Sequence, residues 1–254
     1  MGTLSAFAAD TDSSITIAGA AMTAADLKTA VSNALADGKR DFTITGNLSE
    51  AQQKEVGGAF RDWCGEAEGE PYNPGGQGTV TLTLSDVTEV FAETFGSYEY
   101  ISSYALKQVN LPKATVIGDR AFALSEYIQS VTAPNVTAFG SNAFWACSSL
   151  TSIDAPKVET VAWGCFGHTA ITTFPWENLI SIGSTAFRNC DSLTGHINLL
   201  KISSIGNSAF DFCDNIKGVF APNVTTVEYN AFEGAVGLTR LTFNTPMESW
   251  GGQV

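Results

Sequence analysis

The stretch "IGSTAFRNCDSL", from Ile182 to Leu193, holds the pattern that decides the fold. It contains a glycine, an Ala-Phe pair, a cysteine three residues after the phenylalanine, and then a leucine. The same order of residue types recurs around six phenylalanines that are 22, 22, 21, 23 and 22 residues apart: Phe122, Phe144, Phe166, Phe187, Phe210 and Phe232. Self-similarity at a period between about 20 and 50 residues is typical of a solenoid, in which each repeat forms one coil.

Positions around these phenylalanines repeat in the same register. Alanine precedes five of the six, and Cys165 takes that position in the remaining copy. An earlier copy, in "LTLSDVTEVFAETF", has Val90 and Phe95 at the two anchor positions. It is followed by an insertion of roughly five residues around "GSYEYI", which we expect to loop out of its coil. The register predicts about seven repeats over residues 80–254.

The position three residues after each phenylalanine takes only small residues: Ser125, Cys147, Thr169, Cys190, Cys213 and Ala235. A small residue repeated in this way indicates an inward-facing position, where cysteine acts as a small buried apolar side chain. The alternative is a disulfide or a metal site. The chain, however, has five cysteines, no Cys-x-x-Cys, and only two histidines, His168 and His196, in different registers. We interpret the cysteines as packing residues and predict no metal site and no cofactor.

One copy, "VTAFGSNAFWACSSLTSIDAP" (136–156), writes the repeat out most fully. The pattern I/V-x-x-I-G-x-x-A-F-x-x-C-x-x-L-x-x-I-x-x-P resembles the BspA-type leucine-rich repeat of bacterial surface proteins, and the resemblance covers residues 80–245. It implies an α/β solenoid, a right-handed superhelix of short parallel strands with one strand per repeat of 21–27 residues. Two copies depart from the pattern: the one after Phe166 is one residue short, and the one after Phe187 reads "TGHINLL" without proline.

The same resemblance implies a location and a function. Members of this family are exported to the bacterial cell surface or the extracellular space and are associated with adhesion to host extracellular proteins and with aggregation between cells. For this chain the resemblance implies a non-enzymatic binding protein with a protein partner, which could be the host extracellular matrix. Two alternatives stay open: a structural spacer or scaffold module without a ligand of its own, and a module that captures glycans.

The N-terminal third lacks the Ala-Phe signature. Two short β-prone runs, "SITIAG" (14–19) and "DFTITG" (41–46), are each followed by a helical pattern. Thr23 is placed to cap the first helix, and Ser49 with Gln52 forms a capping box for the second. A solenoid needs a cap because its terminal coil would otherwise expose the core. We therefore predict an N-terminal α/β cap of strand–helix units over residues 14–79.

Two expectations concern the ends of the chain. Residues 1–13 contain the small-x-small triplet Ala6-Phe7-Ala8, and we interpret this segment as a signal-peptide remnant or as disordered. The last predicted strand, "TRLTF" (239–243), is followed by few residues. Either Trp250 folds back over this end, or the edge is bare and we expect the natural protein to continue beyond Val254 or to pair there.

Charge and motifs exclude several classes of function. The formal net charge is −13, and it divides into −6 over residues 1–79 and −7 over residues 80–254. Nucleic acid and anionic lipid need clustered basic residues, so neither is expected as a partner. No apolar run reaches the length of a membrane span, and we predict no membrane insertion. No HExxH, GxSxG or P-loop motif occurs, so we predict no catalytic residue and no enzyme.

Strand alternation predicts which residues face outward. In "TSIDAP" it places Ile153 inward and Ser152 and Asp154 outward. The same register gives an outward ladder along the stack: Thr81, Thr83, Gln108, Asn110, Ser130, Thr132, Ser152, Asp154, Thr173, His196, Asn198, Gly218, Phe220, Arg240 and Thr242. Its last third contains a small aromatic and basic patch, and arginine with aromatic residues is the usual chemistry of binding hot spots.

We therefore predict ligand binding on the strand face by six of these residues: Ser152, Asp154, His196, Asn198, Phe220 and Arg240. A rival site is the insertion loop "GSYEYISSY" (96–104), because loops rich in tyrosine bind readily. Its candidate residues are Tyr98, Tyr100 and Tyr104.

Overall fold

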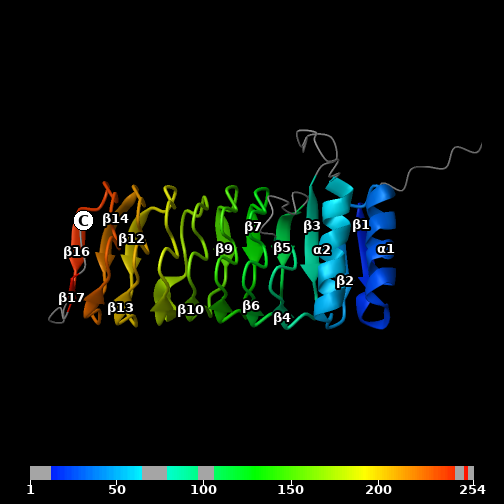
Figure 1. Cartoon of the computed structure of the whole chain (residues 1–254), viewed down its shortest axis with the longest axis horizontal. Helices are drawn as coiled ribbons and strands as arrows, with labels where there is room; N and C mark the ends of the chain where they lie inside the picture. Colours follow the sequence, from blue (N-terminus) through cyan, green and yellow to red (C-terminus); the bar gives the residue numbers. More distant parts are fainter. Residues whose placement is uncertain (1–12, 65–78, 97–105, 244–248, 251–254) are drawn as a thin grey trace, which may run out of the picture.

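The computed structural model describes residues 13–64, 79–96, 106–243 and 249–250. Within these ranges the chain forms an elongated stack of coils, with two helices at the N-terminal end and short strands along the rest (Figure 1). The strands pair in parallel with those of neighbouring coils. This arrangement confirms the predicted α/β solenoid.

The longer strands form one face of the stack. Its N-terminal part is a six-stranded sheet in the order β1 (Ser14–Ala18), β2 (Asp41–Thr45), β3 (Val80–Leu84), β5 (Leu106–Asn110), β7 (Ser130–Thr132) and β9 (Ser152–Asp154). Its C-terminal part is a three-stranded sheet of β12 (Gly195–Asn198), β14 (Ile216–Phe220) and β16 (Arg240–Thr242). We call these two sheets together the strand face.

A second set of strands makes a second face, so the prediction of one strand per repeat was incomplete. Five of these strands form one sheet: β4 (Glu89–Val90), β6 (Val116–Ile117), β8 (Ala138–Phe139), β10 (Thr160–Val161) and β11 (Ser181–Ile182). The other three form another: β13 (Ser204–Ile205), β15 (Thr226–Val227) and β17 (Ser249–Trp250). A strand of two residues is too short to show alternation, and alternation is the signal by which a strand is read from sequence.

One coil has no strand on the strand face. This is the copy after Phe166 that is one residue short, and it separates β9 from β12. On the strand face one backbone bond still links it to each neighbour, with Thr172 donating to Thr151 and Thr194 donating to Thr172, both at 3.2 Å. Trp176, at the start of the 3₁₀-helix η2 (Trp176–Asn178), is buried. The shortened coil thus keeps its core contacts and loses its ladder.

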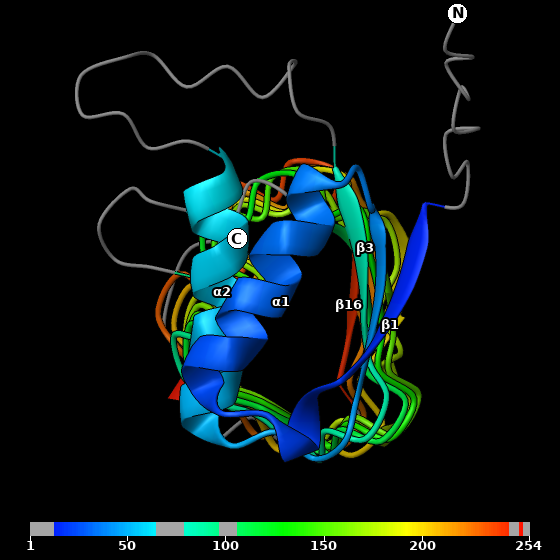
Figure 2. The same cartoon turned by 90° about the vertical axis from the view of Figure 1, so that its right-hand side faces the viewer.

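The segment predicted as a cap continues the same stack. Strands β1 and β2 join β3 in register, and the short 3₁₀-helix η1 (Gly19–Ala21) follows β1. Helices α1 (Ala24–Ala36) and α2 (Glu50–Cys64) lie across the stack from β1 and β3 (Figure 2). The predicted N-terminal capping bonds of both helices are confirmed. The hydroxyl of Thr23 accepts from the Asp26 amide at the start of α1. At the start of α2 the Ser49 amide donates to the Gln52 side chain at 2.9 Å, and the Gln52 amide donates to the Ser49 hydroxyl at 3.3 Å.

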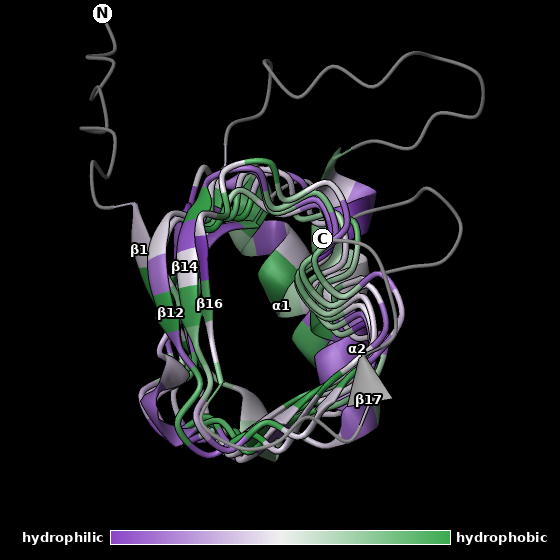
Figure 3. Ribbon diagram, turned by 90° about the vertical axis from the view of Figure 1, so that its left-hand side faces the viewer, coloured by the Kyte–Doolittle hydropathy of each residue, from purple (hydrophilic) through white to green (hydrophobic). Residues whose placement is uncertain are grey.

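Equivalent residues of successive coils form columns, because the coils superpose closely when the stack is seen from its end (Figure 3). The repeated phenylalanines form the largest column, from Phe95 to Phe232. Their rings stack with centroids 5.2–5.6 Å apart and planes within 12° of parallel. All seven rings are at most 1 % exposed. This column is the centre of the hydrophobic core.

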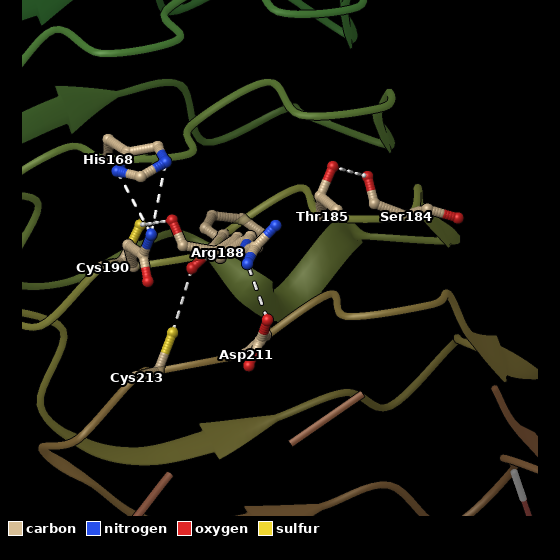
Figure 4. Close-up of polar contacts among 9 residues, drawn as sticks. His168, Ser184, Thr185, Arg188, Cys190, Asp211 and Cys213 are labelled. Atoms are coloured by element: carbon tan, nitrogen blue, oxygen red, sulfur yellow. Dashed lines mark hydrogen bonds and ion pairs between the residues drawn. The ribbon is translucent and has the colours of Figure 1, made fainter. Parts of the chain in front are cut away.

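The cysteines of the repeat lie in the core, as predicted. Cys147, Cys165, Cys190 and Cys213 are fully buried, and none forms a disulfide. The Cys190 thiol donates to the carbonyl of Phe166 at 3.1 Å. The Cys213 thiol donates to the carbonyl of Phe187 at 3.0 Å, and Figure 4 shows both cysteines beside Arg188. Burial raises the pKa of the Cys147, Cys165 and Cys213 thiols above the usual range. These side chains therefore fill space and satisfy core carbonyls.

A candidate binding site on the strand face

The outward ladder has the predicted register wherever the strand face is formed. On β7 and β9, Ser130 pairs with Ser152 and Thr132 pairs with Asp154. On the three-stranded sheet two rows run across the strands. One row is His196, Gly218 and Arg240, and the other is Asn198, Phe220 and Thr242. Thr173 is exposed, but it lies in the strandless coil and joins neither row.

These two rows enclose an open hollow on the surface, with a volume of about 250 Å³. The residues that line it come from β12, β14 and β16: His196, Asn198, Gly218, Val219, Phe220, Arg240 and Thr242. Four of the six predicted strand-face residues are among them. The structure thus brings His196, Asn198, Phe220 and Arg240 together, and we call this place the strand-face hollow.

Two glycines shape the hollow. Gly218 stands between His196 and Arg240 in its row and contributes no side chain, so the His196 imidazole can lie over it. Gly195 belongs to the coil whose repeat is one residue longer than its neighbours, and it has a φ of +83°, which favours glycine. The pairing of β12 with β14 shifts register at Gly195. Such irregularities re-aim side chains, and here His196 follows the shift directly.

The hollow combines an apolar surface with polar side chains. The Phe220 side chain is 38 % exposed, whereas Val219 beneath the sheet surface is buried. Arg240 is exposed, and its Nε donates to Thr242 Oγ1 on the same strand at 3.3 Å. That bond restrains the guanidinium at the rim of the hollow. Both side chains therefore remain available to a partner.

The other predicted residues lie elsewhere. Ser152 and Asp154 are exposed on β9, and the strandless coil separates them from the strand-face hollow. Tyr98, Tyr100 and Tyr104 of the rival insertion loop lie outside the described residues. The site that the structure supports is therefore smaller than the predicted one.

Another surface carries aromatic residues that the sequence reasoning did not single out. Trp163 and Tyr229 are 52 % and 59 % exposed and stand three positions before Phe166 and Phe232 in their coils. Trp145 packs its ring edge-on against His168, with centroids 4.6 Å apart. Burial and the nearby Arg188 lower the pKa of His168. When the repeats are aligned in register, Trp163 and Tyr229 fall in one column. That alignment is the sequence signal from which their common surface could have been predicted.

A larger hollow of about 400 Å³ lies beside the start of α2. Three of its polar side chains are already used within the fold. Ser49 and Gln52 form the capping box, and the Asn47 side chain accepts from the Thr88 amide at 3.3 Å. This hollow therefore offers a ligand fewer uncommitted groups than the strand-face hollow does.

Metal binding and membrane crossing have no candidate in the part of the chain that the structure describes. Within those ranges no three His, Cys, Asp or Glu residues are grouped so that they could hold a metal ion. Nor does any described helix have the length and apolar character that a membrane crossing requires.

Two solved structures from bacteria have a similar fold. A leucine-rich cell surface protein from Faecalibacterium prausnitzii matches with a TM-score of 0.57 and 24 % identity, over 66 % of this chain and 49 % of that one. A leucine-rich repeat protein from Bacteroides ovatus matches with a TM-score of 0.53 and 21 % identity, over 63 % of this chain and 42 % of that one. This chain thus corresponds to half or less of their lengths, and the likeness shows the fold alone. No match was found among curated proteins.

The family assignment comes from the repeats themselves. The model of the BspA type leucine-rich repeat region matches residues 93–201 and 181–254 with six copies. These matches span the columns of phenylalanine and small residues described above, and they cover more than half of the chain. The chain therefore belongs to the BspA-type leucine-rich repeat family.

Proposed function

We propose that this protein is a non-enzymatic binding protein, exported to the bacterial surface or secreted, which adheres to a host extracellular protein or to other cells. The strand-face hollow is its anchor point. The observation that carries the proposal is the grouping of Phe220, Arg240 and His196 around one hollow on three paired strands.

The size of the hollow favours a protein partner. Sites for small molecules usually have volumes of about 300–1,000 Å³ and enclose most of the ligand. The strand-face hollow, at about 250 Å³, is smaller and open. It suits one or two side chains that project from a larger surface. The neighbouring ladder residues would extend the contact as a rigid polar rim, as is usual around a hot spot.

The fold also suits this function. A stack of coils held by a continuous column of phenylalanines presents its strand face as a rigid surface. A rigid surface loses little conformational entropy on binding, so more of the contact energy is available as affinity. Arg and aromatic residues carry the largest share of such energy, and the hollow contains both.

Direct binding measurements test the proposal. The purified chain is titrated onto immobilised extracellular-matrix proteins, intact bacterial cells and a glycan array at physiological salt. We expect saturable binding to a protein or cell surface that is lost in the triple variant His196→Ala, Phe220→Ala, Arg240→Ala. The matched control is Ser130→Ala with Thr132→Ala, which changes the equivalent ladder on β7.

Three other results would point elsewhere. Binding that the triple variant retains would place the contact outside the hollow, with the loop of Tyr98, Tyr100 and Tyr104 as the next site to vary. Binding confined to the glycan array would favour glycan capture. Absence of binding to all of these surfaces would favour the spacer function.

A further inference from the structure

Arg240 differs from the other arginines of this chain in its partners. The other four contact carboxylates, carbonyls or an aromatic ring: Arg40 stacks on Trp63 and donates to Leu35 and Lys39, Arg61 donates to Thr94, Arg120 pairs with Glu93, and Arg188 pairs with Asp211. Arg240 donates only to the hydroxyl of Thr242, and it does so through Nε. Its two terminal nitrogens thus have no acceptor among the described residues.

The lack of an acidic partner for Arg240 contrasts with the excess of acidic residues in the chain. Acidic residues outnumber basic ones by 26 to 13, so a surface arginine here has many carboxylates with which it could pair. No acidic residue is among the described residues that line the strand-face hollow. Arg240 therefore contributes a positive charge to the hollow, and no acidic side chain that lines the hollow pairs with it.

The geometry of the hollow suits a carboxylate. A guanidinium presents two parallel N–H groups that match the two oxygens of a carboxylate, and this bidentate pair is among the stronger hydrogen-bonded contacts. The bond from Nε to Thr242 leaves the terminal nitrogens for that purpose. His196 and Asn198 at the opposite side of the hollow provide further polar contacts, and the exposed Phe220 ring lies between the two sides.

We propose that the strand-face hollow recognises a carboxylate next to an apolar group, namely an aspartate or glutamate of the protein partner that pairs with Arg240 while a neighbouring apolar side chain covers Phe220. This inference rests on the proposed function and specifies what the anchor point binds. The net acidic surface of the chain disfavours acidic partners in general, whereas the guanidinium of Arg240 favours an acidic residue at the hollow.

Short peptides test the inference without knowledge of the natural partner. The probes are a capped tetrapeptide with adjacent phenylalanine and aspartate, and the same peptide with asparagine in place of aspartate. Each is titrated into ¹⁵N-labelled protein while the NMR signals of the β12, β14 and β16 residues are followed. We expect saturable shifts around the hollow with the aspartate peptide and an affinity about 10- to 100-fold lower for the asparagine peptide, because a charged hydrogen bond is lost.

Variants separate charge recognition from packing. Arg240→Gln should abolish the preference for aspartate over asparagine, and Arg240→Lys should retain part of it, since lysine keeps the charge and loses the bidentate geometry. Trp163→Ala, on a different surface, should change neither affinity. Equal affinities of the two peptides for the wild-type protein would overturn the inference, as would no binding of the aspartate peptide.

Two further outcomes identify what has failed. A sugar acid such as glucuronic acid that binds in the hollow more tightly than the peptide would assign the carboxylate to a glycan and overturn the protein assignment. Binding of the whole partner that Phe220→Ala weakens and Arg240→Gln leaves unchanged would overturn carboxylate recognition alone. In that case the proposed adhesive function would stand.

Discussion

The imidazole of His196 lies across Gly218, so that a side chain on Gly218 would begin only 2.8 Å from His196 Cδ2. The absence of a side chain at Gly218 therefore does two things. It adds no side chain at the middle of the row, and it lets the His196 imidazole lie over the next strand on the side of Arg240, which follows Gly218 in the same row. A glycine inside a strand often marks such a place, where something must approach the backbone closely.

Adding a methyl group at Gly218 should weaken binding without weakening the fold. In Gly218→Ala the nearest atoms are the end of the His196 side chain, which can move. We expect the affinity for the partner to fall about tenfold, equivalent to about 1.4 kcal/mol. The free energy of unfolding should be unchanged or higher by up to about 1 kcal/mol, since alanine is less flexible than glycine in the unfolded chain. Unaltered affinity in a surface plasmon resonance titration would show that the hollow is not used.

Removing one ring from the phenylalanine column should destabilise the whole protein. Phe144 is fully buried and stacks on Phe122 and Phe166 at 5.2 and 5.4 Å. We expect Phe144→Ala to lower the free energy of unfolding by about 3–5 kcal/mol, measured by urea denaturation. Phe220→Ala is the matched control, because its ring is on the surface and should cost no more than about 0.5 kcal/mol. Similar losses in the two variants would contradict the assignment of the column as the core.

The turns around the phenylalanines contain non-glycine residues with left-handed backbone. Ala146 has a φ of +56° and its amide donates to the Gly167 carbonyl of the next coil at 2.8 Å. We expect Ala146→Gly to stabilise the protein by about 0.5–1 kcal/mol, because the strain relieved exceeds the added flexibility of the unfolded chain.

Ala162→Gly provides the control for that change. Ala162 directly precedes the turn of the next coil, four positions before Phe166, and its φ is not positive. We expect this variant to lose about 0.5–1 kcal/mol, since only the cost of flexibility remains. Thermal unfolding of both variants measures the difference, and a loss of stability in Ala146→Gly would show that the left-handed turn is not strained.

The cysteines should differ in their reactivity toward a thiol reagent. Cys64 at the end of α2 is partly exposed, whereas the other four of the five cysteines are fully buried. Burial raises the pKa of the Cys147, Cys165 and Cys213 thiols, so the reactive thiolate is scarce at neutral pH. We expect a spectroscopic thiol assay to detect one thiol in the native protein and all of them in denaturant. Rapid reaction of the buried thiols without unfolding would contradict their place in the core.

The repeat could be predicted from the sequence because each buried column uses one type of residue. Phe144 and Phe166, like Cys147 and Cys190, mark equivalent positions by identity and spacing alone. The outward ladder was also predictable, since alternation in a strand fixes which side of the sheet a residue faces. These are local rules, and in a stack of coils local rules repeat along the whole molecule.

Features that depend on contacts between coils were harder to predict. The two-residue strands such as β8 and β10 are defined by pairing, which no single repeat shows. The loss of a strand in the coil of Thr172 and Thr173 follows from a missing residue whose effect depends on the neighbouring coils. The hollow depends on Gly218. Because glycine has no side chain, it does not stand out in a repeat that is recognised by its side chains.

The candidate site was therefore predicted in part. Placing His196, Phe220 and Arg240 near one another needed only the register. The separation of Ser152 and Asp154 from them depended on the interrupted sheet, which the sequence signalled only as a repeat one residue short. Trp163 and Tyr229 form no run in the sequence, so their common surface becomes visible only once the coils are aligned.

The most direct test of the account asks whether the partner touches the strand-face hollow. A photoreactive phenylalanine analogue is placed at Asn198, at the rim of the hollow, and in separate samples at Thr132 and at Trp163. After irradiation of the complex, we predict a covalent adduct with the partner from position 198 and none from position 163, with at most a weak adduct from position 132. An adduct from position 163 without one from position 198 would contradict the account and place the binding surface around Trp163.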